Sequence, residues 1–290
     1  LATYNGEKYL REQLDSLVRQ KGVLVKILVR DDGSTDKTHE ILDEYQNRGL
    51  LSWYTGEHLN VQNGYLDLLK NAPKSDYYAF CDQDDVWDDD KLLLAVTELD
   101  EMPVDKPAMY YCGQRLVDEN LKLISVHRIA ANRNAHTNFL ISNVAGCTAV
   151  FNQVLVDAVN SKSPDFILMH DSWLFKICLA LGGNYYADSA AHISYRQHGN
   201  NVAGLNGGVR GKIRQVERYL DVFEIQKQCK NLLACYADQM TPEFRDLTER
   251  ICNYDQSFGN WKRLLMSKEF DFKSSSLNSV VKLKILLKKM

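Results

Sequence analysis

The chain has 290 residues, of which 45% are hydrophobic, and its formal net charge is −3 at pH 7. This length suits one large domain or one domain with an appendage, and the lack of a basic surplus argues against nucleic acid as a partner. The seven cysteines show no CxxC or Cys/His ligand spacing and fit the reduced thiols of a cytoplasmic protein.

The first third of the sequence alternates helical and strand patterns. Apolar spacing predicts a helix over 7–20, and the almost continuously apolar run 23–29 predicts a strand that is covered on both faces. Further helices are expected at 34–48, 62–71 and 88–102, and further strands at 50–56 and 76–82. This order predicts an α/β fold with a mostly parallel central sheet flanked by helices, and with ligands at the carboxyl ends of the strands. The first strand, at residues 1–3, is expected to have lost its upstream half.

The middle of the chain is less regular. Strands are expected at 107–113, 143–151, 184–188 and 191–198, with a hairpin over 114–125 and a helix over 170–183. The glycine-rich stretch 200–212 is either a linker or a lid, and helical patterns follow it to the end. We therefore expect an α/β domain over 1–204 and a helical C-terminal extension over 205–290.

A dense acidic cluster follows the predicted strand 76–82. The stretch FCDQDDVWDDD, residues 80–90, contains six aspartates within nine positions. Carboxylates that converge at a sheet edge repel one another unless a cation lies among them, and Mg²⁺ binds one or two carboxylates together with substrate phosphates. Asp82 and Asp84 are therefore candidates for a metal clamp on a diphosphate, with a solvated turn as the alternative. Residues 88–90 fit the first turn of a helix.

A second acidic pair, Asp31 and Asp32, follows the predicted strand 23–29. A carboxylate at a strand end can accept hydrogen bonds from a ribose hydroxyl or a base N–H, although an Asp-Asp-Gly turn is an equally good explanation. The phosphate-binding patterns GxxxxGK[ST] and GxGxxG are absent from the sequence.

Six segments in a fixed order resemble family 2 glycosyltransferases of the GT-A fold, and above all bacterial enzymes of the rhamnosyltransferase type. These segments are ATYNGEKYLREQLDSL, VRDDGSTDKT, FCDQDDVW, NVAGCTAVF, MHDSWL and YRQHGNNV. The resemblance implies a Rossmann-like GT-A domain that binds a dTDP- or UDP-sugar. It also implies an inverting hexosyl transfer, with L-rhamnose from dTDP-rhamnose preferred, to a hydroxyl of a growing cell-surface polysaccharide or lipid-linked glycan.

The same resemblance implies roles for individual residues. Asp82 and Asp84 would hold Mg²⁺ or Mn²⁺ on the diphosphate, and His198, with His192 as its competitor, would touch the metal or the diphosphate. Asp171 would be the general base, although the family usually has Glu-Asp where this chain has His170 and Asp171. A simple helix cap is the alternative for Asp171. The nucleotide-sugar contacts would be Thr3, Tyr4, Asn5, Glu7, Asp31, Asp32, Asp82, Gly146 and Cys147.

The C-terminal stretch VVKLKILLKKM places four lysines on an apolar background, with WKRLL upstream. A basic, apolar helix of this kind can lie on an anionic membrane surface, so we expect peripheral contact with the inner face of the cell membrane. A helix packed on its own domain, with solvated lysines, is the alternative.

Two other functions fit the sequence less well than glycosyl transfer. A nucleotidyltransferase normally has a glycine-rich, basic loop after its first strand, and ATYNGEKYL lacks that composition. A non-catalytic module that binds nucleotide sugars or glycans would not need to keep Asp82, Asp84 and Asp171 together.

Overall fold

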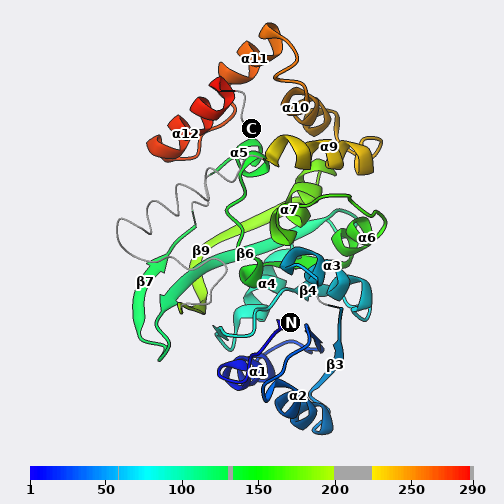
Figure 1. Ribbon diagram of the computed structural model, residues 1–290, viewed down its shortest axis with the longest axis vertical. Helices are drawn as coiled ribbons and strands as arrows, with labels where there is room; N and C mark the ends of the chain where they lie inside the picture. Colours follow the sequence, from blue (N-terminus) through cyan, green and yellow to red (C-terminus); the bar gives the residue numbers. More distant parts are fainter. Residues whose placement is uncertain (58, 130–132, 199–223, 288–290) are drawn as a thin grey trace.

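The computed structural model describes residues 1–57, 59–129, 133–198 and 224–287, which form an α/β structure (Figure 1). Its strands are β1 (Ala2–Thr3), β2 (Ile27–Asp31), β3 (Leu51–Thr55), β4 (Tyr77–Ala79), β5 (Val86–Trp87), β6 (Ala108–Val117), β7 (Leu123–His127), β8 (Val150–Asn152) and β9 (Asn184–Arg196). Its helices are α1 (Leu10–Val18), α2 (Thr38–Asn47), α3 (Val61–Asn71), α4 (Lys91–Asp100), α5 (Ala135–Leu140), η1 (Gly146–Thr148), α6 (Gln153–Asn160), α7 (His170–Ala180), α9 (Ile225–Tyr236), α10 (Pro242–Cys252), α11 (Phe258–Leu265) and α12 (Ser275–Leu286).

The strands form two sheets that meet beside the acidic segment. In the first sheet β1, β2 and β3 are parallel. The second sheet has the order β4-β8-β6-β9-β5, in which β6 and β9 are parallel and the other pairs are antiparallel, and β7 pairs with β6. The backbone N–H of Ala2 donates to the carbonyl of Cys81 at 3.3 Å and so joins the two sheets. The carboxyl ends of β1 and β2 therefore lie next to residues 82–85.

Strand β6 is covered on both faces, because successive side chains of a strand point to opposite sides. Met109 and Tyr111 pack into the cluster that contains α3, α6 and α7. Tyr110 and Cys112 pack into the cluster that contains α1, α2 and α4. This double burial explains the apolar sequence of the strand and fixes the sheet between two helical layers.

The expected α/β fold with a helical C-terminal region is confirmed, and three local predictions need correction. The expected strands 184–188 and 191–198 form one strand, β9, whose register shifts between residues 188 and 191. Only Val150–Asn152 of the strand expected at 143–151 extends into the sheet, since Gly146–Thr148 forms a 3-10 turn. The pair Val86–Trp87 forms an additional strand. The hairpin over 114–125 is confirmed by the pairing of β6 with β7.

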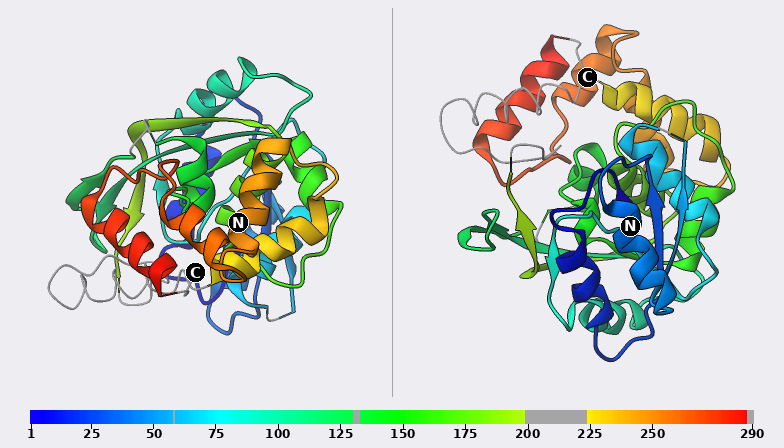
Figure 2. Two further views of the ribbon diagram at one scale, coloured as in Figure 1. Left: turned by 90° about the horizontal axis from the view of Figure 1, so that it is seen from above. Right: turned by 60° about the horizontal axis from the view of Figure 1, so that its bottom comes forward.

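The C-terminal helices pack on the α/β part at the end opposite to β1–β3, as Figures 1 and 2 show. The ring of Tyr236 on α9 lies 6.2 Å from that of Trp173 on α7, and the N–H of Thr241 donates to the carbonyl of Ala180 at 2.9 Å. The expected boundary at 204/205 and the glycine-rich stretch 200–212 lie outside the described residues. Among the helices of the described ranges, none has both the length and the apolar character needed to cross a bilayer.

Candidate active site

A cavity of about 1230 Å³ opens where β1, β2, the acidic turn 82–85, η1 and the start of α7 meet. Most residues that the sequence singles out line this cavity, whereas Asp31 and His192 are not among its lining residues. The lining residues named from the sequence are Thr3, Tyr4, Asn5, Glu7, Asp32, Asp82, Asp84, Gly146, Cys147, Asp171 and His198. Segments from both ends of the α/β part therefore contribute to one site.

The turn after β1 is fixed to the acidic turn by Gln83, a residue that the sequence analysis did not single out. Its Oε1 accepts hydrogen bonds from the Thr3 hydroxyl at 2.6 Å and from the Tyr4 N–H at 2.9 Å. The side chains of Asn5 and Glu7 instead accept hydrogen bonds from the N–H groups of Thr35 and Lys37. Thr3 and Tyr4 therefore face the acidic turn, while Asn5 and Glu7 hold the turn after β2 against the turn after β1.

The adjacent residues Asp31 and Asp32 have different environments. The buried carboxylate of Asp31 accepts hydrogen bonds from the N–H groups of Gly33 and Ser34 and from the Ser34 hydroxyl, and lies 2.8 Å from His39 Nε2. Burial acts to raise the pKa of Asp31, but the hydrogen bonds from Ser34 and His39 bring it below its ordinary value. Asp32 lines the cavity. This geometry supports Asp32 rather than Asp31 as the ligand contact, and gives Asp31 the task of holding the turn.

Arg30 is a further residue that the sequence analysis missed. Its guanidinium is fully buried and forms ion pairs with Asp32 and with Asp67, the latter at 2.9 Å. It also donates to the carbonyl of Glu57. A Cβ atom at Gly56 would lie 2.4 Å from Arg30 Nε, so the glycine is needed for this close approach. Arg30 lies behind the cavity lining and orients Asp32 through their ion pair.

The three carboxylates of the acidic turn have separate partners. Asp82 accepts a hydrogen bond from the Tyr65 hydroxyl at 2.5 Å, and Asp84 Oδ2 lies 2.6 Å from His198 Nε2. Asp85 accepts from the N–H of Arg196 at 3.1 Å, while its buried Oδ2 atom has no hydrogen-bond partner among the described residues. Burial raises the pKa of Asp82 to about 6, and burial and the charge of Asp82 raise that of Asp85.

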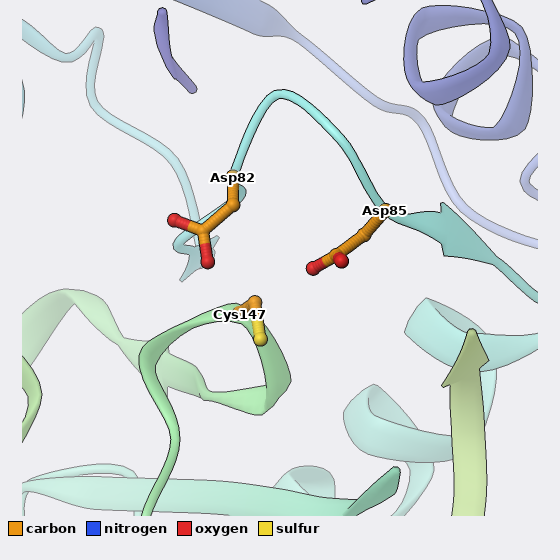
Figure 3. Close-up of side chains that lie close together, drawn as sticks. All are labelled: Asp82, Asp85 and Cys147. Carbon is orange, nitrogen blue, oxygen red and sulfur yellow. The ribbon is translucent and has the colours of Figure 1, made fainter. Parts of the chain in front are cut away.

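These groups offer ligands to a divalent cation. The carboxylates of Asp82 and Asp85 converge on the thiol of Cys147, and the ligand atoms of these residues lie within 4.8 Å of one another (Figure 3). Burial raises the pKa of Cys147 well above its ordinary value, so this sulfur stays protonated and is a poor ligand for a hard ion. The carboxylates and the imidazole of His198 suit Mg²⁺ or Mn²⁺, and the unpartnered oxygen of Asp85 adds a ligand that the sequence analysis did not assign.

Asp171 lies in the first turn of α7 and faces the same cavity. Burial raises its pKa to about 6, although the N–H groups of Ser172 and Gly146 act in the opposite direction. The N–H of Ser172 donates to the Oδ1 atom of Asp171, with an N···O distance of 2.6 Å. Asp171 is half-buried, and a carboxylate with this pKa is ionised at neutral pH and is more basic than an ordinary aspartate, as a general base requires.

His170, whose role the sequence left open, is a packing residue in the structure. Its ring stacks on Tyr65 with a centroid distance of 4.0 Å, and burial lowers its pKa to about 3. The imidazole is therefore neutral at physiological pH and carries no charge into the site. A Cβ atom at Gly146 would lie 2.6 Å from its Nε2 atom, so Gly146 lets η1 approach the start of α7.

Comparisons with known proteins agree on one family. Residues 1–159 match the family described as Glycosyl transferase family 2. The chain is 29% identical to dTDP-rhamnosyl transferase RfbG of Shigella flexneri over 238 residues, which cover 74% of this chain and 78% of that protein. It is 23% identical to an uncharacterized glycosyltransferase of Rickettsia prowazekii over 231 residues, which cover 77% of this chain and 69% of that protein.

Solved structures show the same fold. The crystal structure of S. aureus TarS 1–349 in complex with UDP-GlcNAc matches with a TM-score of 0.60 and 16% identity, and covers 98% of this chain and 79% of that chain. At this level of identity the likeness concerns the fold alone, and together with the family match it confirms the GT-A fold expected from the sequence.

Proposed function

The chain belongs to glycosyl transferase family 2, and on this premise we propose that it is an inverting hexosyltransferase that moves a sugar from a nucleoside diphosphate to a glycan hydroxyl. The proposal rests on one observation. The same cavity is lined by Asp171, Asp82, Asp84 and Asp32. A base with a raised pKa, a set of metal ligands and a nucleotide-facing carboxylate are the parts that such a transfer needs.

The proposed reaction is a single displacement. Asp171 takes the proton from the acceptor hydroxyl while the hydroxyl oxygen forms a bond to the anomeric carbon of the donor. The bond between that carbon and the diphosphate oxygen breaks on the opposite face, which inverts the configuration and needs no covalent sugar–enzyme intermediate. Asp82, Asp84 and His198 would hold Mg²⁺ or Mn²⁺, whose charge stabilises the departing nucleoside diphosphate.

For the donor we propose dTDP-L-rhamnose. The support is the relative RfbG, whose name describes a dTDP-rhamnosyl transferase. Asp32 suits this donor because a carboxylate can accept the N3–H of thymine, but uracil offers the same group, so a UDP-sugar is the second candidate. Thr3, Tyr4, Gly146 and Cys147 are the proposed further contacts of the donor, since all of them line the cavity.

For the acceptor we propose a growing cell-surface polysaccharide or a lipid-linked glycan at the inner face of the cell membrane. In this account residues 1–204 carry the chemistry, and the extension 205–290 contacts the membrane. Support comes from α12, which buries Val281 and Ile285 against the protein while Leu283 and Leu286 stay 53% and 52% exposed. Lys282 on the same helix is exposed, whereas Lys284 is buried. Exposed leucines beside a lysine suit the surface of an anionic membrane.

A donor screen tests the proposed function. The purified protein is incubated with dTDP-rhamnose and with common UDP- and GDP-sugars, with Mn²⁺ or with EDTA, and Asp84→Ala is the control. We expect one donor to be bound and slowly hydrolysed with Mn²⁺ only, and the variant to lose this activity. A folded protein that binds no donor would contradict the proposal and favour a non-catalytic module.

A further inference from the structure

Part of the cavity lining is apolar. Its side chains come from the end of α5 and the segment after it, from the segment before α7 and from the first turn of α9. We call this group the apolar lobe, and it consists of Leu140, Ile141, Val144, Leu168, Met169 and Ile225. None of these residues has a role in the proposed binding of the nucleotide, the sugar diphosphate or the metal.

A single amide, that of Gln228, accompanies the apolar lobe. Gln228 follows Ile225 by three residues on α9, so the two side chains share one face of the helix, and both line the cavity. Gln228 is fully buried, yet neither its Nε2 nor its Oε1 atom has a hydrogen-bond partner within the part of the chain that the structure describes. A buried amide without partners is unfavourable and rare in native proteins, so this amide indicates a ligand that supplies both an acceptor and a donor.

We propose that Gln228 and the apolar lobe form the subsite for the acceptor sugar, an assignment that rests on the proposed glycosyl transfer. A sugar ring combines an apolar C–H face with hydroxyl groups that both donate and accept hydrogen bonds. The side chains of the lobe match the ring face or the methyl group of a deoxysugar, and the amide matches its hydroxyls. The lobe contains no charged side chain, so a neutral sugar fits it better than a phosphate or a carboxylate does.

The position of the lobe suits transfer. Met169 belongs to the lobe and Asp171 follows it by two residues, so a ring in the lobe lies beside the proposed base. The hydroxyl to be glycosylated can then face Asp171 while another hydroxyl of the same ring pairs with Gln228. This arrangement makes the C-terminal extension part of acceptor recognition.

Helix α9 is held firmly enough to orient the amide. Cys229 and Leu232 of α9 are buried in the core cluster that also contains α6 and α7. The Tyr236 hydroxyl donates to the carbonyl of Ala158 at 3.1 Å, which ties α9 to α6. A binding group on such a supported helix is preorganised for its ligand.

The test compares Gln228→Met with Gln226→Met, a matched control two residues away on the same helix. Transfer is measured from the donor that the wild type uses to the p-nitrophenyl glycosides of α-L-rhamnose, β-D-galactose and N-acetyl-β-D-glucosamine. For Gln228→Met we expect kcat/KM for the acceptor to fall by about tenfold or more, while the affinity for the donor stays within about twofold. For Gln226→Met we expect acceptor kinetics within about twofold of the wild type.

Thermal unfolding adds a readout that separates binding from structure. Gln228→Met removes a buried amide without partners, so its melting temperature should equal or exceed that of the wild type. Gln226 is not among the lining residues of the cavity, and Gln226→Met removes its hydrogen bonds to the carbonyl of Cys252 at 2.8 Å and to Asp255 at 2.9 Å, so this variant should melt at a lower temperature. If Gln228→Met melts lower and transfers normally, the amide is structural and the proposal is wrong.

The remaining outcomes distinguish the two proposals. A wild type that cleaves its donor but glycosylates none of these sugars would contradict the acceptor subsite alone, as would equal losses of donor affinity and transfer in Gln228→Met. A wild type that neither binds nor cleaves any nucleotide sugar would refute glycosyl transfer itself, and the subsite with it.

Discussion

The Nε2 atom of His198 lies 2.6 Å from the Oδ2 atom of Asp84, although 114 residues separate them in the sequence. The end of β9 brings the histidine there, because the N–H of Arg196 donates to Asp85 in the same turn. The ring of Tyr9 stacks on His198 with a centroid distance of 5.2 Å and orients it further. The rival His192 pairs with Asp188 at 3.0 Å and lies near Asp88 and Asp90 in a separate group that could hold an ion, outside the lining of the cavity. His198 is therefore the stronger candidate for a metal ligand.

His198→Ala should weaken the binding of the metal, with His192→Ala as the matched control. We expect the Mn²⁺ concentration for half-maximal activity to rise by about tenfold or more in His198→Ala, because a ligand or its close partner is lost. It should stay within about twofold in His192→Ala. An equal metal requirement in the two variants would contradict the assignment.

Asp171→Asn should abolish most transfer without loss of the donor. A positioned general base contributes about 10²- to 10⁴-fold to the rate, and asparagine keeps the size of the side chain but cannot take up the proton. We expect kcat to fall by about this factor while the affinity for the donor, measured by calorimetry, is nearly unchanged. Transfer that survives within a few-fold would show that another group is the base.

The rate should depend on pH through the same carboxyl group. Asp171 acts in its ionised form, and burial raises its pKa to about 6. Below that pH the base is protonated, so kcat/KM should fall about tenfold per pH unit, and above it the rate should level off. Asp82 has a similar pKa, so the profile is recorded at saturating Mn²⁺, where the cation keeps that carboxylate ionised. If kcat/KM instead falls with a midpoint near pH 4, the carboxyl group that controls the rate is not Asp171.

Gly56→Ala should disturb Asp32 through Arg30. The new Cβ atom would lie within 2.5 Å of the Arg30 guanidinium, which is buried and paired with Asp32 and Asp67 and therefore cannot move freely. We expect a loss of about 1–3 kcal/mol in the free energy of unfolding, as for other overpacked sites, and weaker binding of dTDP or UDP. Gly259→Ala is the control, since its Cβ atom would meet its nearest neighbour at 3.9 Å. If Gly56→Ala binds dTDP and UDP as tightly as the wild type does, Arg30 has no influence on nucleotide binding.

A double variant that carries Leu283→Gln and Leu286→Gln should bind membranes less strongly than the wild type. Both side chains point outward from α12, so the double variant should fold normally and lose apolar area for the bilayer. The measurement is flotation with vesicles of phosphatidylglycerol and phosphatidylethanolamine. Leu24→Gln is the control, because Leu24 is 91% exposed on the α/β part. Equal flotation of all three proteins would favour a C-terminal helix that serves only the protein's own packing.

The acidic turn could be predicted because it directly follows an aromatic-rich strand segment, and the start of α7 because it opens a strongly apolar helical segment. Position alone cannot tell which of two neighbours faces a ligand. Asp31 and Asp32 are adjacent at the end of β2, and successive side chains there point to opposite sides, so one is fixed in the turn and the other faces the cavity. Only the three-dimensional structure makes this assignment.

Two residues gave no signal in the sequence. Arg30 stands between apolar Val29 and acidic Asp31 in β2, and its partner Asp67 lies 37 residues away in the sequence. Gln228 lies in a helical region without a motif, and its buried amide reaches the cavity only because α9 packs on the α/β part. Contacts between distant segments of this kind depend on packing, which periodicity does not encode.

The most direct test of the central claim is the anomeric configuration of the transfer product, followed by NMR from the first turnovers. Displacement assisted by Asp171 predicts a product with the configuration opposite to that of the donor, so dTDP-β-L-rhamnose should give an α-linked rhamnoside. A product that retains the configuration of the donor would contradict the single displacement and the role of Asp171 as its base.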